Sequence, residues 1–220
     1  PEPGASDADA SEYARSVVDR LRAILQGPMT TEPAISLDLS LRPEGRNGPL
    51  VRSLESCAEY YSSWSSVWEH QALIRARHTA GDSDLSANFL SRVADPLRFP
   101  AVPPDEESVA EIRRLKARME GERLPRGVRR DRHLKLGLGG LSDVEWTVQL
   151  LQLRHAGHEP ALRTGSTMTA LDALVSLGLI GEGDGTILRN SWRLCTAARN
   201  PNYPWTGRTA QASVLPDDRV

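Results

Sequence analysis

The sequence predicts an α+β protein that is mostly helical, with a short β-strand in its first part and an α-helical bundle in its second. Apolar and polar residues alternate over residues 34–41, which is the period of a strand with one polar face. Elsewhere the apolar residues recur every three or four positions, as in amphipathic helices. Prolines cluster near residue 100 and indicate a boundary. We therefore expect a first domain over 1–100, the helical bundle over 101–200 and an irregular tail over 201–220.

The expected helices follow the apolar spacing along the chain. In the first of them, Tyr13, Val17 and Leu21 lie four positions apart and share one face. The same spacing predicts helices over residues 11–25, 54–64, 85–93, 106–122, 141–156, 167–178 and 184–199. Residues 69–80 fit either a helix or a strand that carries Arg75 and Arg77 on one face. After Asn200, prolines and a glycine interrupt the helical pattern, so we assign no helix to the tail.

The composition limits the class of protein. The chain has 220 residues, 39% of them hydrophobic and 25% charged, with a formal net charge of -2. This is enough apolar material for a packed core, and it gives no bulk attraction to nucleic acid or to a membrane surface. No apolar run approaches the roughly 20 residues that cross a bilayer, and the sequence leads us to expect no signal peptide. Cys57 and Cys195 lie in apolar helical patterns, so we expect buried thiols in a reducing, cytoplasmic compartment.

The predicted strand and the turn after it carry the first candidate site. Asp38 lies on the polar face of the strand, and Arg42 lies on the same side at its end, with Arg46 in the turn. A carboxylate supplies hard oxygen ligands for Mg²⁺, and a guanidinium supplies a fork of donors for phosphate. The pattern therefore suits a Mg²⁺–nucleotide site. The alternative is an ordinary Asp–Arg pair on the solvated face of a strand.

A glycine-rich turn before the helix predicted over 141–156 carries the second candidate site. Ser142 and Glu145 have the spacing of a capping box, and Asp143 in the first turn suits the helix dipole. This structural interpretation leaves Gly139, Gly140 and the preceding Lys135 unexplained. The two glycines would allow the backbone to approach a nucleotide or another helix closely.

Three further patterns each have a simpler interpretation. Glu69, Arg75 and Arg77 could meet a triphosphate or a substrate if they lie on a strand, but are solvated if they lie on a helix. The basic run over 126–132 has no interleaved aromatic residues, so it indicates an exposed loop rather than an RNA site. His155 and His158 lack supporting ligands nearby, so we expect surface residues rather than a zinc site.

Three segments together resemble the glutamate–ammonia-ligase adenylyltransferase family, which belongs to the polymerase-β-like nucleotidyltransferases. They are Asp38–Arg52, Trp68–Arg77 and Lys135–Trp146, and the likeness runs in order from about residue 11 to about residue 200. It is greatest to the actinobacterial type and to the C-terminal half of the enzyme. In that family the C-terminal half adds AMP and the N-terminal half removes it.

The resemblance implies the C-terminal part of a polymerase-β-like domain followed by a helical bundle. It also implies that a tyrosine hydroxyl of glutamine synthetase attacks the α-phosphate of ATP, with Mg²⁺ ions at the reacting oxygens. Asp38 aligns with the third metal-binding carboxylate of the superfamily and could help to take the proton from the hydroxyl. The implied nucleotide or phosphate contacts are Arg42, Arg46, Lys135, Gly139 and Gly140, with Glu69, Arg75, Arg77, Asp143 and Glu145 as further candidates.

The chain departs from the family pattern where the first two carboxylates are expected. Residues 5–9 imitate the Gly-Ser-x-Asp-x-Asp motif by letters, but a helix follows where the motif needs an apolar strand. Asp7 and Asp9 are better explained as helix-capping residues, and we expect the true pair before Pro1. Two other functions stay open. One is phosphorolytic removal of AMP, and the other is a non-catalytic piece that binds glutamine synthetase or a PII-type regulator.

Overall fold

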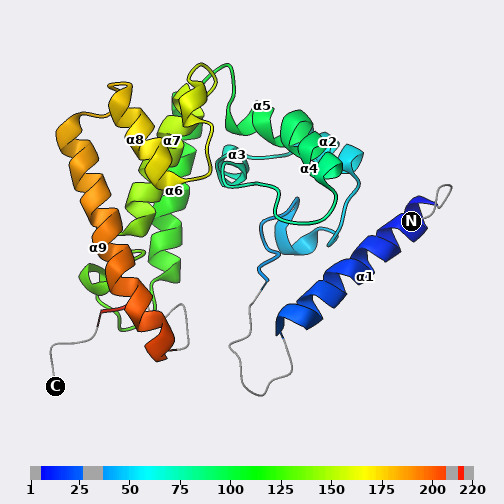
Figure 1. Cartoon of the computed structure of the whole chain (residues 1–220), viewed down its shortest axis with the longest axis horizontal. Coiled ribbons are helices and arrows are strands. Elements are labelled where there is room, and N and C mark those ends of the chain that lie inside the picture. Colours follow the sequence, from blue (N-terminus) through cyan, green and yellow to red (C-terminus); the bar gives the residue numbers. More distant parts are fainter. Residues whose placement is uncertain (1–5, 27–36, 207–212, 216–220) are drawn as a thin grey trace. The chain divides into compact units, whose positions relative to one another are not determined.

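The computed structural model of the chain describes residues 6–26, 37–206 and 213–215 (Figure 1). These residues are mostly helical, as predicted, and none of them forms a β-strand; their only β contact is one isolated antiparallel bridge between His133 and Val214. The chain divides into two compact units, Pro1–Ser65 and Ser66–Val220. The domain boundary near residue 100 remains a prediction, because compactness alone does not define the domains of the protein.

The described residues of the first unit, 6–26 and 37–65, form two α-helices and one short 3-10 helix. Helix α1 spans Asp7–Gln26 and includes the helix predicted from its apolar stripe. None of its side chains is buried, and Tyr13 and Ile24 are 57% and 74% exposed. The 3-10 turn η1 covers Gly45–Asn47, and α2 covers Leu54–Ser63.

The strand predicted over residues 34–41 is not found in the part of it that the structure describes. Residues 34–36 lie outside the described residues, and residues 37–41 form no strand. Leu37 and Leu41 are 37% and 72% exposed, so the alternation does not bury an apolar face here. A strand is defined by hydrogen bonds to a neighbouring strand, and the described residues of this unit contain no such neighbour.

The second unit begins with short helices and continues as a bundle of longer ones. Its elements are α3 (Val67–Leu73), α4 (Ser83–Phe89), the π-helical turn η2 (Leu90–Ala94), α5 (Asp95–Arg98), α6 (Glu106–Arg123), η3 (Arg130–Arg132), α7 (Leu141–His155), η4 (Pro160–Leu162), α8 (Thr167–Ser176) and α9 (Glu182–Thr206). The ambiguous segment over 69–80 is therefore helical as far as Leu73. The alternative of a strand through Arg75 and Arg77 is wrong.

The core of the second unit lies around α7. Its largest cluster joins α7, the turn after it and α8, and consists of Val148, Ala156, Leu162, Ala170, Leu171 and Leu174. A second cluster of Ile74, Ile112 and Leu153 joins the end of α3 to α6 and α7. Figure 1 shows α6, α7, α8 and α9 side by side in this bundle. The helical bundle predicted from the sequence is therefore present.

The end of the chain is more regular than predicted. Helix α9 continues to Thr206 through Pro201 and Pro204, so the prediction of irregular structure is wrong for residues 201–206. Each proline removes one backbone donor, which weakens a helix but need not end it when neighbouring residues continue to be paired. Beyond α9, Ser213 and Leu215 pair with the backbone of residues 132–134: Leu134 N donates to Ser213 O at 2.8 Å, and Leu215 N donates to Arg132 O at 2.9 Å.

Candidate functional site

Arg42 holds the loop that follows Asp38. Its guanidinium donates hydrogen bonds to backbone carbonyl oxygens of this same loop, those of Leu39, Arg46 (3.3 Å), Gly48 (3.1 Å) and Pro49 (3.2 Å). The loop also needs a glycine, because a Cβ at Gly48 would lie 2.2 Å from the carbonyl oxygen of Pro43. Arg42 therefore acts first as a support for the loop, and a phosphate contact by this residue remains a prediction.

Asp38 and Arg46 are both exposed on the same loop. Asp38 Oδ1 accepts a hydrogen bond from Ser40 N at 2.9 Å, and Arg46 Nε lies 3.5 Å from Ser40 Oγ. The structure thus brings Asp38, Arg42 and Arg46 together within one loop. It does so through the loop backbone, and not through the shared strand face on which they were predicted to meet.

The described residues do not by themselves form a metal centre. Among them, no group of three or more His, Cys, Asp or Glu side chains is arranged to hold a metal ion. Asp38 is a single carboxylate, whereas a hard cation such as Mg²⁺ takes several oxygen ligands. His158 is exposed and its Nε2 lies 3.0 Å from Ala101 O, whereas His155 is of intermediate exposure.

The glycine-rich segment forms a closed turn around His133. His133 is 6% exposed, and its Nδ1 accepts hydrogen bonds from Lys135 N (3.2 Å) and Leu136 N (3.0 Å). Gly137 N donates to His133 O at 2.8 Å, and Leu141 N donates to Leu134 O at 2.9 Å. Burial, followed by the positive charges of Lys135 and Arg199, lowers the pKa of His133, so the neutral ring that these bonds require is favoured.

The backbone of this turn is directed inward rather than toward a ligand. Gly139 N donates to Asp143 Oδ2 at 2.7 Å, and Gly140 N donates to Gly137 O at 3.0 Å. A Cβ at Gly140 would lie 2.8 Å from Leu134 O, and Gly139 has a φ of +71°. A phosphate-binding loop needs N–H groups that are open to the ligand. The glycines thus have a structural explanation, and nucleotide binding by Gly139 and Gly140 remains a prediction that this geometry does not strengthen.

The prediction of a capping box at the start of α7 is wrong. The N-cap residue is Gly140, without a side-chain cap, so Ser142 lies inside the first turn, where it is 2% exposed. Glu145 forms an ion pair with Arg75 at the end of α3. Asp143 does lie in the first turn as predicted, where a carboxylate suits the helix dipole.

A partly buried ionic network joins α6 to the glycine-rich turn. Lys116 pairs with both Glu120 and Asp143, and Arg130 pairs with Glu120, which is 5% exposed. Burial opposes the charge of Lys116, but the hydrogen bonds to Asp143 and Glu120 outweigh it, so the pKa of Lys116 is raised. The exposed side chain of Lys135 lies on the same turn.

Helix α3 is joined to α7 by polar contacts. Gln71 Nε2 donates to Gln149 Oε1 at 2.9 Å between two buried side chains, and Arg75 pairs with Glu145. Glu69 is the second member of a capping box and accepts from Ser66 N at 2.8 Å. The contacts of Glu69 and Arg75 are therefore structural, whereas Arg77 is exposed.

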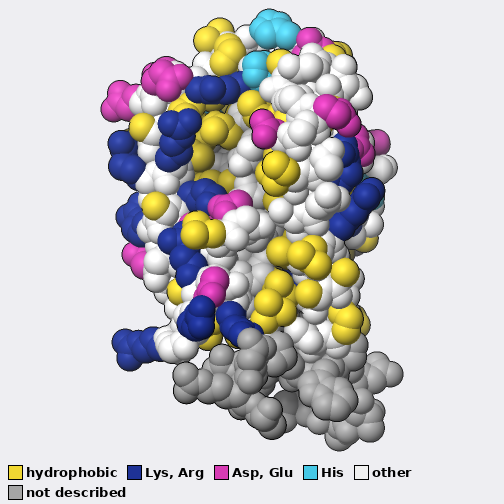
Figure 2. All heavy atoms as spheres, turned by 90° about the vertical axis from the view of Figure 1, so that its left-hand side faces the viewer, with side chains coloured by type: hydrophobic (Ala, Val, Ile, Leu, Met, Phe, Trp, Pro, Cys, Tyr) yellow, Lys and Arg dark blue, Asp and Glu magenta, His cyan; other side chains and the backbone are white. Residues whose placement is uncertain are grey.

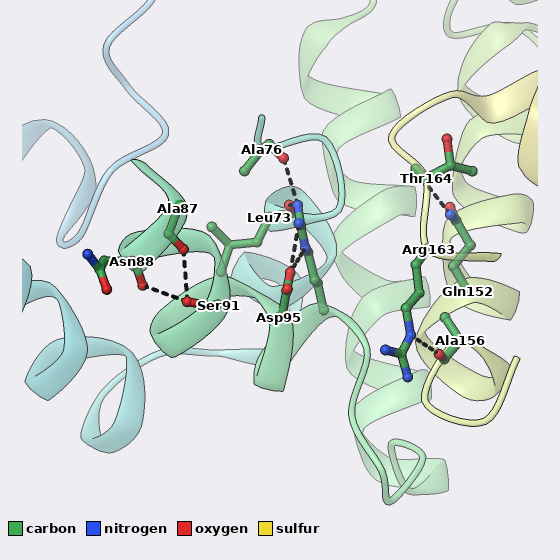
Figure 3. A network of polar contacts seen from close by, with 11 residues as sticks. Leu73, Ala76, Ala87, Asn88, Ser91, Asp95, Gln152, Ala156, Arg163 and Thr164 are labelled. Atoms are coloured by element: carbon green, nitrogen blue, oxygen red, sulfur yellow. Dashed lines mark hydrogen bonds and ion pairs between the residues drawn. The ribbon is translucent and has the colours of Figure 1, made fainter. Parts of the chain in front are cut away.

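Arg98 is a buried arginine that the sequence did not single out. It donates to the carbonyl oxygens of Leu73 (3.0 Å) and Ala76 (2.6 Å) and pairs with Asp95 at 2.7 Å (Figure 3). Leu73 is the last residue of α3, and its carbonyl oxygen also accepts from Ala76 N at 2.9 Å, so Arg98 holds the turn that follows the helix. The sequence indicates this ion pair only through the spacing of Asp95 and Arg98, which lie three positions apart beside a proline.

Three of the simpler interpretations can be compared with the structure. Cys57 and Cys195 are free thiols of intermediate exposure, and burial raises the pKa of each. Arg126, Arg129 and Arg130 are exposed, as expected for the basic loop. Searched over the described residues, no helix is both long enough and apolar enough to cross a membrane.

Two family models match the chain, one on each side of the prolines near residue 100. The glutamate-ammonia ligase adenylyltransferase model matches residues 1–92, and the GlnD PII-uridylyltransferase model matches residues 110–201. Bifunctional glutamine synthetase adenylyltransferase/adenylyl-removing enzymes match almost the whole chain. The one from Bifidobacterium longum subsp. infantis is 61% identical over 99% of the chain, and those from Cutibacterium acnes and Streptomyces avermitilis are 51% and 50% identical over 97% and 99%.

The matched residues make up only a small part of each relative. The chain spans 20%, 22% and 21% of the lengths of these three proteins. Identity at this level over nearly the whole chain shows that the chain belongs to the glutamate–ammonia-ligase adenylyltransferase family, and the actinobacterial relatives agree with the type expected from the sequence.

Proposed function

We propose that the chain contributes to the transfer of AMP from ATP to a tyrosine of glutamine synthetase, in the cytoplasm and as part of the control of nitrogen assimilation. The observation that carries this proposal is the identity of 50% to 61% to enzymes named for this activity, over 97% to 99% of the chain. The curated names include the adenylyl-removing activity as well. The resemblance of the motifs to the adenylyl-transferring half favours transfer, and phosphorolytic removal is the second candidate.

The Asp38 loop is the part of the chain that we assign to the chemistry. In the proposed arrangement, the sheet of a polymerase-β-like domain is completed in the longer protein, and Asp38 is one of several carboxylates there that hold Mg²⁺. Arg42 supports the loop from inside, which leaves the exposed Arg46 as the better candidate for a phosphate of ATP. In the second unit, the exposed side chain of Lys135 is the candidate for binding a phosphate.

The bundle after residue 100 is assigned to regulation and target binding. The match of residues 110–201 to the GlnD PII-uridylyltransferase model supports a separate helical domain, as well as a PII-type protein as a regulatory partner. The match of residues 1–92 to the adenylyltransferase model supports the first domain. The two matches together agree with a domain boundary near residue 100.

The test is a chimera, in which these 220 residues replace the corresponding part of the Bifidobacterium longum relative. Labelled ATP, Mg²⁺ and glutamine synthetase are supplied, and AMP transfer is measured. We expect labelling by the chimera and its loss in Asp38→Asn. This variant keeps the hydrogen bond to Ser40 N, because the amide oxygen can still accept, so the fold should be unchanged.

Two outcomes would change the assignment. Full labelling by Asp38→Asn would remove Asp38 from the reaction. If the chimera fails to label glutamine synthetase but releases ADP from the adenylylated protein when phosphate is added, the removal activity becomes the better assignment. Circular dichroism of both proteins provides the control for folding.

A further inference from the structure

Positive charge is concentrated in one stretch of the second unit. Residues 113–135, here called the basic segment, contain ten Lys and Arg residues against three Asp and Glu residues, whereas the whole chain has a formal net charge of -2. The segment runs from the middle of α6 through the loop to the glycine-rich turn. The rest of the chain must therefore carry a surplus of negative charge.

Much of the positive charge of this segment is exposed and, within the part of the chain that the structure describes, has no neighbouring carboxylate to neutralise it. Glu120 is buried and pairs with Lys116 and Arg130, and the exposed Asp131 pairs with the exposed Arg129. Five other arginines are exposed, and among the described residues none has an ion-pair partner. They are Arg113, Arg114, Arg118, Arg123 and Arg126.

The far ends of two other segments add to the same region. Residues 213–215 pair with the backbone of residues 132–134 but carry no charge, whereas Arg199, near the end of α9, adds a positive charge that acts on His133. Figure 1 shows the end of α6, the start of α7 and the end of α9 at the same end of the bundle. Figure 2 shows Lys and Arg side chains, with Asp and Glu side chains among them, along one edge of the face on the left of Figure 1; further Lys and Arg side chains lie at the opposite edge, and apolar side chains gather elsewhere on this face.

The stability of α6 does not explain these charges. The dipole of a helix favours positive side chains only in its last turn, where α6 has Arg123. Arg113, Arg114 and Arg118 lie before that turn, and Arg126 lies after the helix. Like charges so close together repel each other, so their concentration is unfavourable unless a partner of opposite charge compensates it.

A protein partner fits the segment better than a nucleic acid does. Proteins that bind single strands combine positive charge with aromatic side chains that stack on bases. There is no Phe, Tyr or Trp between Phe99 and Trp146. Interlaced Glu122 and Asp131 also interrupt the positive charge, which suits a patterned protein surface more than a uniform phosphate backbone.

We propose that the basic segment is the surface on which the chain docks the protein that it modifies, through an acidic face of that protein. This inference rests on the proposed function, because glutamine synthetase is then the docked partner. Charges of opposite sign accelerate the encounter of two proteins and fix their relative orientation, without taking part in the reaction. An enzyme that acts on one tyrosine of a large protein needs such a surface outside its reactive groups.

The experiment reverses the charge of the segment in the chimera. The variant Arg118→Glu/Arg123→Glu/Arg126→Glu uses exposed residues outside the candidate nucleotide site. The control Arg15→Glu/Arg20→Glu/Arg92→Glu makes the same change of net charge at exposed arginines elsewhere. We expect the KM for glutamine synthetase to rise about tenfold in the first variant at low salt, with kcat and the KM for ATP unchanged. In the control variant, the KM for glutamine synthetase should stay within about twofold of the parent value.

A binding measurement separates the two proposals. Biolayer interferometry compares the chimera and its variants with glutamine synthetase and with poly(U) RNA, over a range of salt concentrations. We expect the affinity of the chimera for glutamine synthetase to fall as the salt concentration rises. In the reversed variant, the affinity should depend less steeply on salt. Equal affinity of the reversed variant and the parent overturns the docking surface, as does tighter binding to poly(U) than to glutamine synthetase. If binding follows the expectation while no labelling occurs, the docking surface stands and the proposed transfer fails. A neutral variant with glutamine at the same three positions should give an intermediate affinity.

Discussion

The amides of Gln71 and Gln149 form a hydrogen bond of 2.9 Å between α3 and α7, and the two side chains are only 3% and 7% exposed. This contact joins the segment matched by the adenylyltransferase model to the segment matched by the uridylyltransferase model. Arg75 and Glu145 form an ion pair between the same two elements. The short helix before the prolines thus packs as part of the bundle that follows them.

The first prediction concerns this buried pair. Gln149→Met should destabilise the chain by about 1–3 kcal/mol, because the buried amide of Gln71 would lose its partner. Gln71→Met/Gln149→Met should recover most of this loss, since two apolar side chains of similar size then replace two polar ones. Urea unfolding followed by tryptophan fluorescence provides the measurement. This explanation would be contradicted if the double variant lost more unfolding free energy than the two single variants lose together.

The second prediction compares two glycines that differ in their surroundings. A Cβ at Gly137 would lie 2.3 Å from Arg130 O and 2.5 Å from His133 O, whereas one at Gly121 in α6 meets nothing within 4 Å. Gly137→Ala should therefore cost about 1–3 kcal/mol or more through overpacking. Gly121→Ala should stabilise the helix by about 0.5–1 kcal/mol. Thermal unfolding of the two variants shows whether each substitution raises or lowers the stability. Equal changes in stability would mean that the turn around Gly137 is not closely packed.

The sequence predicted the helices better than the loops, for a physical reason. The spacing of apolar residues determines which face of a helix is buried, and α2, α6, α7 and α8 all lie within a few residues of their predicted bounds. The strand at 34–41 failed in its described part because a strand depends on a neighbour, which local alternation cannot supply. The helix past Pro201 was missed because proline is usually read as a stop, although the loss of one donor does not by itself end a helix.

The candidate site was predicted as a set of residues but not as a set of contacts. The strand face that Asp38 and Arg42 were predicted to share is not found, although both lie in one loop. The carbonyls that Arg42 binds depend on the fold of residues 39–49, which no pattern of residue types shows. The role of His133 as an acceptor was missed for the same reason. Nothing in its spacing indicates that two backbone N–H groups would point at its ring.

The third prediction is a dependence of stability on pH. Burial lowers the pKa of His133 below its ordinary value of 6.5, so between the two pKa values the unfolded chain binds more protons than the folded chain. The contribution of neutral His133 to the free energy of unfolding is therefore complete above pH 6.5. It is lost progressively as the pH falls from 6.5 toward the lower pKa of the folded state. His70, whose pKa is also lowered by burial, acts in the same direction.

The test of this prediction replaces His133 by asparagine. The side-chain oxygen of asparagine can accept from the N–H groups of Lys135 and Leu136 but does not titrate in this range. We expect His133→Asn to reduce the fall of the melting temperature between about pH 7 and pH 5, with the remainder coming from His70. An unchanged pH profile would show that the pKa of His133 is the same in the folded and unfolded chains, against the burial of its ring and the two hydrogen bonds that its Nδ1 accepts.

The fourth prediction concerns the Asp38 loop. The four carbonyls that Arg42 binds need the flat fork of a guanidinium, whereas the ammonium of lysine is a compact group with fewer donors. Arg42→Lys should therefore open the loop almost as much as Arg42→Ala. Because Leu41 is 72% exposed, chymotrypsin can report the opening, and cleavage there should become about tenfold faster, equivalent to about 1.4 kcal/mol. Arg46→Lys is the control, since among the described residues the Arg46 side chain makes one hydrogen bond, to Ser40 Oγ at 3.5 Å, and the cleavage rate of this variant should be unchanged. If Arg42→Lys is cleaved as slowly as the parent, the guanidinium does not hold the loop and becomes available to a phosphate.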